Sequence, residues 1–164
     1  MYSEEKKSRE ICYQSALSKV QHICSRQEKC CFDIRKKLET WQLSYDDQDK
    51  IIDSLINDRF IDENRYAGFY VRDKYRFNKW GRIKISHHLK QKKIPEYIIS
   101  EAFEAIKESE YLENLDDILR SKLKSTRETD PYLLKGKLFR FAQSRGFESD
   151  LVLKNIEKIL HKDY

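Results

Sequence analysis

Residues 85–94 read ISHHLKQKKI, and the pattern inside this stretch decides the fold. Two apolar residues stand four positions apart, and a third follows five positions later. The same pattern occurs at residues 34–43 (IRKKLETWQL) and 138–147 (LFRFAQSRGF), so its second apolar position recurs after 51 and then 53 residues. The four-residue spacing is that of one face of a helix. A unit that recurs at such intervals is typical of a stacked, elongated array rather than of one compact core.

Each recurrence is one part of a repeat that contains three helical stripes of apolar residues. We expect the repeats at about residues 9–60, 61–107 and 108–162, within a single module spanning 1–164. No stretch alternates polar and apolar residues long enough to form a strand. The sequence therefore predicts an all-α fold of three tandem three-helix repeats.

Several helix ends carry recognisable capping residues. Ser44 with Asp47 resembles a capping box, and Asp62 and the pair Asp130-Pro131 are N-terminal signals. We expect Pro95 in the first turn of its helix and Gly146 in the left-handed conformation after its helix.

The composition excludes several classes of protein. Only 4 glycines and 2 prolines occur in 164 residues, which argues against a phosphate-binding loop or a Rossmann turn. The first ten residues lack the apolar segment of a signal peptide, and no apolar run approaches the length of a membrane span. We expect a cytoplasmic, monomeric protein without membrane contact.

We also expect no metal, cofactor or catalytic centre. The 4 cysteines lack the Cys-x-x-Cys spacing of zinc sites, and adjacent His87 and His88 point about 100° apart on a helix. The acidic residues at 46, 47 and 49 invite a Mg²⁺ nuclease interpretation, but they follow Ser44 in a helix first turn, where the helix dipole favours acids. No nucleophile stands in a motif with its base. We predict that the protein is not an enzyme.

Charge is strongly segregated along the chain. Residues 65–93 contain ten Lys or Arg, one acid and six interleaved aromatics, residues 101–117 contain seven acids and one lysine, and residues 120–145 contain eight Lys or Arg and two acids. A charge run is often only a solvated helix face. A basic stripe is also the electrostatic footprint of a partner that is a phosphate backbone or an acidic protein surface.

The most basic block supplies the candidate binding residues, whose role would be electrostatic docking: Arg72, Lys74, Arg76, Lys79, Arg82, Lys84 and Lys92. We expect that changing Arg72, Arg76 and Arg82 to Glu weakens partner binding without unfolding the protein.

The central stretch resembles the RecX family of recombination regulators. The resemblance rests on residues 60–67 (FIDENRYA), on Phe69-x-Val71-Arg72, and on Lys79-x-Gly81-x-x-x-Ile85-x-x-x-Leu89-x-x-Lys92-x-Ile94. The family usually has Asp-Asp-x-x-Phe-Ala where residues 62–67 read DENRYA, and a glycine where this chain has Lys93 and Gln42. A residue other than glycine there needs another helix ending or must tolerate the left-handed conformation at some cost.

The resemblance implies a curved module that acts in homologous recombination, DNA repair and the SOS response. The implied partner is the RecA filament on single-stranded DNA, with inhibition of RecA's ATPase, filament growth and strand exchange. Weak direct binding to DNA is possible in this interpretation. The alternative is a sequence-nonspecific nucleic-acid-binding protein of helix-turn-helix type, which places a helix in the major groove.

Overall fold

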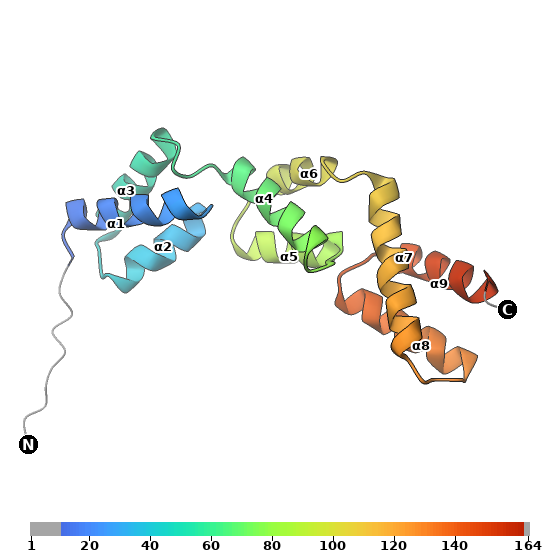
Figure 1. Cartoon of the computed structure of the whole chain (residues 1–164). Coiled ribbons are helices and arrows are strands. Elements are labelled where there is room, and N and C mark those ends of the chain that lie inside the picture. The colour runs from blue at the N-terminus through green and yellow to red at the C-terminus, as the bar shows by residue number, and fades with distance from the viewer. Residues whose placement is uncertain (1–10, 163–164) are drawn as a thin grey trace, which may run out of the picture. The chain divides into compact units, whose positions relative to one another are not determined.

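The computed structural model describes residues 11–162, which form nine α-helices and no strand (Figure 1). The helices are α1 (Tyr13–Arg26), α2 (Cys31–Thr40), α3 (Tyr45–Asn57), α4 (Glu63–Arg76), α5 (Arg82–Gln91), α6 (Glu96–Glu104), α7 (Glu108–Ser125), α8 (Pro131–Ser144) and α9 (Ser149–Lys162). The all-α class and the three-helix repetition predicted from the sequence are confirmed. No described helix has the length and apolar character needed to cross a membrane.

The helices form three groups of three: α1–α3, α4–α6 and α7–α9. By their contacts the described residues divide after residue 66 into two compact units: the first contains α1–α3 and the first turn of α4, and the second contains the rest of α4 with α5–α9. The repeat boundaries expected near residues 60 and 107 fall in the connections that precede α4 and α7. The predicted curvature of the whole array stays a prediction.

The core of the first unit contains the apolar residues of the recurring pattern in α2 and apolar residues of α1 and α3. Ile34 and Leu38 of α2 are buried against residues of α1 and α3, among them Val20 and Leu55. One polar side chain, Gln48, is buried with them and donates its Nε2 hydrogen to the Leu43 carbonyl oxygen at 2.9 Å. Burial of such side chains is the main favourable term for so small a unit.

In the second unit, the corresponding residues Ile85, Leu89 and Leu138 are fully buried. Tyr111 of α7 lies between the second and third helix groups. Its ring centroid is 5.1 Å from that of Phe147 and 6.1 Å from that of Tyr75. Aromatic packing therefore joins the end of α4, the start of α7 and the turn before α9.

The predicted N-caps are present. Ser44 Oγ accepts the Asp47 N–H at 3.2 Å, an Asp62 carboxylate oxygen accepts the Arg65 N–H at 3.0 Å, and an Asp130 oxygen accepts the Leu133 N–H at 2.9 Å. Pro95 differs from its prediction: it is the extended N-cap residue of α6 (ψ 146°), and the first turn begins at Glu96.

The recurring pattern is explained by how its helices end. After α5, the N–H of Ile94 bonds to the Leu89 carbonyl at 3.1 Å and the N–H of Lys93 to the Lys90 carbonyl at 2.9 Å, which is a Schellman motif. After α8, Phe147 bonds in the same way to Ala142 at 3.2 Å. This motif brings the third apolar residue back onto the second, so both are buried together.

One residue of the turn that follows the helix in each recurrence is left-handed, a conformation that favours glycine. Gln42 (φ 58°), Lys93 (φ 59°) and Gly146 (φ 86°) all occupy this position. Of the two alternatives that the sequence left open for Gln42 and Lys93, another helix ending or a left-handed conformation, the structure shows the left-handed conformation.

A basic face on the second helix group and its joint with the third

The seven candidate residues lie along the end of α4, the α4–α5 connection and α5. Arg72, Lys74 and Arg76 are on α4, Lys79 is in the connection, and the others are on or just after α5. We call six of them the α4–α5 cations: Arg72, Lys74, Arg76, Lys79, Lys84 and Lys92. The seventh, Arg82, has a different environment and is described below.

Part of this set gathers around Trp80. The Lys84 ammonium lies 4.6 Å and the Lys74 ammonium 5.6 Å from the centroid of the indole ring. The His88 ring lies against the same indole, with 4.8 Å between centroids. Burial and the nearby charges of His87 and the lysines lower the pKa of His88. The Trp80 ring therefore holds two cations beside a histidine that resists protonation.

The other α4 cations are more exposed. Arg72 and Arg76 are one helical turn apart, and the Arg72 guanidinium lies 5.0 Å from the Phe69 ring centroid. Among the described residues, neither has an acidic partner, whereas Lys74 lies 3.3 Å from an Asp73 oxygen. Lys79, with φ 55°, is also left-handed and exposed. These positions leave uncompensated positive charge in the solvent.

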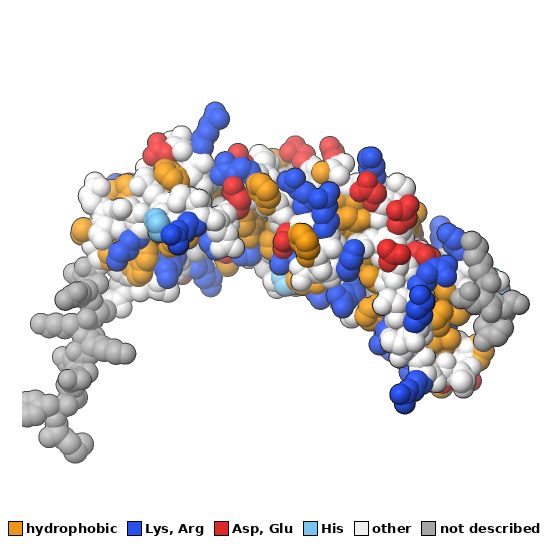
Figure 2. Space-filling model, in the orientation of Figure 1, with side chains coloured by type: hydrophobic (Ala, Val, Ile, Leu, Met, Phe, Trp, Pro, Cys, Tyr) orange, Lys and Arg blue, Asp and Glu red, His pale blue; other side chains and the backbone are white. Residues whose placement is uncertain are grey.

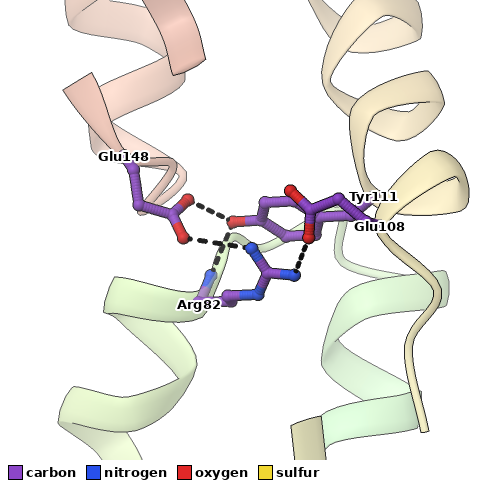
Figure 3. Close-up of polar contacts among 4 residues, drawn as sticks. All are labelled: Arg82, Glu108, Tyr111 and Glu148. Atoms are coloured by element: carbon purple, nitrogen blue, oxygen red, sulfur yellow. Dashed lines mark hydrogen bonds and ion pairs between the residues drawn. The ribbon is translucent and has the colours of Figure 1, made fainter. Parts of the chain in front are cut away.

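Arg82 points into the protein instead (Figure 3). Its guanidinium donates to Glu108 at 2.6 Å and to Glu148 at 3.4 Å, and it lies 3.9 Å from the Tyr111 ring centroid. Burial tends to lower the pKa of Arg82, but the hydrogen bond and charge of Glu108, with the charge of Glu148, raise it overall. The charge of Arg82 is thus already neutralised within the chain.

Tyr111 completes this network. Its hydroxyl accepts the backbone N–H of Arg82 at 2.9 Å and donates to Glu148 at 2.6 Å. Burial, followed by the bond to Glu148, raises the pKa of Tyr111. A buried hydroxyl with both roles satisfied contributes to stability, and removing it strands its partners.

Backbone hydrogen bonds also connect the start of α5 to the turn after α8. The Gly81 N–H bonds to the Arg145 carbonyl at 2.7 Å, and the Ile83 N–H bonds to the Gly146 carbonyl at 3.0 Å. A Cβ atom on Gly146 would stand 2.3 Å from the Lys84 Cβ, so glycine is required both by the close approach and by its φ. We call these contacts, together with the Arg82 network, the α5–α8 joint.

The sequence predicts Arg82 as a docking residue because it lies in the most basic block. No local signal marks its acidic partners, which are 26 and 66 positions away. Replacing Arg82 by Glu would bring a third carboxylate to Glu108 and Glu148, so that variant would probe the joint rather than docking.

The acids of residues 101–117 lie on α6 and α7, and Figure 2 shows acidic side chains over these helices. The cysteines are free thiols, and no three His, Cys, Asp or Glu side chains come together as metal ligands within residues 11–161.

Comparison with known proteins accounts for this architecture. Residues 62–102 match the family description "RecX, second three-helix domain", and residues 108–154 match "RecX, third three-helix domain". A regulatory protein RecX of Clostridium beijerinckii is 29% identical over 154 residues, which are 93% of this chain and 70% of that protein. One from Clostridium botulinum strain Eklund 17B is 30% identical over 130 residues, or 78% and 60% of the two chains. The chain thus spans 60–70% of the length of these two relatives.

Two crystal structures share the fold. RecX from Lactobacillus salivarius superposes with a TM-score of 0.79 at 19% identity, covering 89% of this chain and 95% of that one. A second regulatory protein RecX gives 0.81 at 25% identity, covering 89% and 73%. The resemblance found in residues 60–94 is confirmed: the chain belongs to the RecX family of regulatory proteins.

Proposed function

We propose that this protein inhibits the RecA recombinase by binding the RecA filament on single-stranded DNA, and that it slows ATP hydrolysis, filament growth and strand exchange. The protein catalyses no reaction in this proposal and acts in the cytoplasm as a monomer. The observation that carries it is the set of α4–α5 cations on a chain whose family is regulatory.

The electrostatics of the second helix group support a polyanionic partner. Arg72, Arg76 and Lys79 are exposed, and no acid of the described chain pairs with them. A protein surface that carries charges of one sign associates faster with a surface of the opposite sign. The phosphates of the filament's DNA, or an acidic face of RecA, offer such a surface.

The first test is the rate of RecA's ATP hydrolysis on single-stranded DNA with this protein titrated in. Inhibition at well below one molecule per RecA subunit supports binding to filament ends or within the filament groove. An unchanged hydrolysis rate, together with tight and salt-sensitive binding to bare DNA, would replace the proposal with the nucleic-acid-binding alternative.

A charge-reversal variant tests the docking residues. Arg72→Glu with Arg76→Glu is expected to raise the protein concentration needed for half inhibition by about tenfold or more, because reversing two charges lowers the net charge of the α4–α5 cations by four units. The matched control is Lys154→Glu with Lys158→Glu, which makes the same change on exposed positions of α9. Equal inhibition by the two variants would remove the α4–α5 cations from the proposal.

A further inference from the structure

The basic block at residues 120–145 is not used by the proposed docking face. It lies in the third helix group, where the end of α7 faces α8 across an open hollow of about 570 Å³. The lining includes four cations, two from the α7 side (Lys122, Arg127) and two from α8 (Lys137, Arg140). The hollow is therefore a concave surface of one charge sign, which concentrates an anion more strongly than a convex one.

Three of these four cations lack a carboxylate partner. Lys137 is paired with Glu128 at 2.6 Å, and this bond lowers the pKa of Glu128. Lys122, Arg127 and Arg140 have no acidic partner within the described chain, and the two arginines are exposed. An anion entering the hollow would therefore meet cations that no internal ion pair already neutralises.

Hydroxyl donors offset part of the negative charge at the end of α7. A helix carries partial negative charge at its C-terminus. Here the hydroxyls of Ser125 and Thr126 donate to the Lys122 carbonyl at 2.9 and 2.7 Å, which satisfies an exposed acceptor of the last turn. The Lys122 ammonium is itself held 5.3 Å from the centroid of Phe141.

Phe141 extends the site toward the α5–α8 joint. The same ring lines a second hollow of about 300 Å³, together with two cations, Lys79 and Arg145, and one acid, Asp117. The Arg145 guanidinium lies 5.4 Å from the Phe141 centroid and donates to the Asn78 carbonyl at 2.9 Å. Two hollows that share the Phe141 ring and both carry cations suit an extended ligand with negative charges at intervals.

We propose that the hollow between α7 and α8 binds the phosphodiester backbone of single-stranded DNA, as a second site besides the α4–α5 cations. The proposal rests on the proposed function only in naming single-stranded DNA as the polyanion. A positively charged groove beside an aromatic ring is a general solution for single strands, and arginine matches phosphate oxygens in a bidentate way. An acidic peptide is disfavoured because the larger hollow has one apolar lining residue, Phe141, against which a peptide could bury little.

The test is fluorescence anisotropy of a labelled single-stranded oligothymidine, titrated with the full chain at several salt concentrations. Arg127→Glu with Arg140→Glu is expected to weaken binding by about tenfold or more, and to reduce the slope of log K against log salt by about 1.4, or roughly 0.7 for each lost phosphate contact. Lys154→Glu with Lys158→Glu on α9 is the control with the same charge change, and circular dichroism verifies that both variants are folded.

This second site would be overturned if the unaltered chain did not bind the oligonucleotide, or if the two variants bound it with equal affinity. If the variant Arg127→Glu with Arg140→Glu lost affinity for polyglutamate but kept its affinity for the oligonucleotide, the DNA site would also be overturned, in favour of an acidic protein partner. The RecA assay is read separately, because it tests the proposed function whether or not the hollow binds DNA.

Discussion

At the scale of single residues, the pKa of His88 responds to the positive charges of the second helix group. Its ring lies against Trp80 and near the ammonium groups of Lys74, Lys84 and Lys92. Burial and these charges disfavour the imidazolium form, so the pKa of His88 is lowered from its usual value of 6.5. A lowered pKa means that the unfolded chain binds more protons than the folded one. The contribution of His88 to stability is therefore present above pH 6.5 and is lost as the pH falls through the folded-state pKa.

The pKa of His88 can be followed by proton NMR of its ring. We expect a value below 6.5 in the unaltered chain and a higher value in Lys84→Gln, since that change removes one of the positive charges that lower it. Lys158→Gln on α9 is the control and is expected to leave the titration unchanged. A titration of His88 that is the same in all three proteins would show that Lys84 has no influence on it.

At the scale of secondary-structure elements, the decisive feature is the left-handed residue that follows α2, α5 and α8, which after α5 and α8 belongs to a Schellman motif. Its left-handed residue is Gln42, Lys93 or Gly146, and a side chain in this conformation costs about 1–2 kcal/mol. Glycine avoids that strain but loses about 0.5–1 kcal/mol through the greater freedom of the unfolded chain. The balance favours glycine slightly at an exposed position of this kind.

Lys93→Gly is therefore expected to stabilise the protein by up to about 1 kcal/mol, and Gly146→Ala to destabilise it. The second change adds the close approach of the Lys84 Cβ atom to the unfavourable φ, so its effect is the larger one. Urea unfolding followed by circular dichroism measures both. Gly68→Ala is the contrasting variant: a Cβ there meets nothing within 4 Å and the residue is helical, so it is expected to stabilise the protein by about 0.5–1 kcal/mol. A stabilising Gly146→Ala would contradict the packing described for the α5–α8 joint.

At the scale of the whole molecule, the chain comprises two compact units rather than one continuous core. Leu55 is fully buried in the first unit and Leu89 in the second. The joint between the second and third helix groups lies entirely within the second unit, so its hydrogen bonds contribute to the stability of that unit.

Leu55→Ala and Leu89→Ala are each expected to lower the free energy of unfolding by about 2–5 kcal/mol, because both delete buried methyl groups. Amide hydrogen exchange shows which helices lose protection in each variant. Leu55→Ala should reduce protection in α1–α3, and Leu89→Ala should reduce it from residue 67 of α4 through α9. Equal loss of protection throughout the chain in both variants would mean that the two units unfold as one.

The sequence by itself determined the helices, their caps and their grouping in threes. These features depend on residues within about one or two turns of each other: Ser44 reaches Asp47, and Leu89 meets Ile94 through a local backbone motif. The segregation of charge is likewise a property of consecutive residues. Short-range interactions of this kind can be predicted from spacing alone.

Only the tertiary structure decided which basic residues face the solvent. Arg82 belongs to the same basic block as Arg76, yet it pairs with Glu148, 66 positions away, while Arg76 stays exposed. The hollow at Phe141 likewise needs α7 and α8 to pack before its cations face one another. Charge and apolar character can be seen in a sequence, but their partners across the chain are selected by packing, because many distant carboxylates are chemically equivalent until the fold brings one of them close.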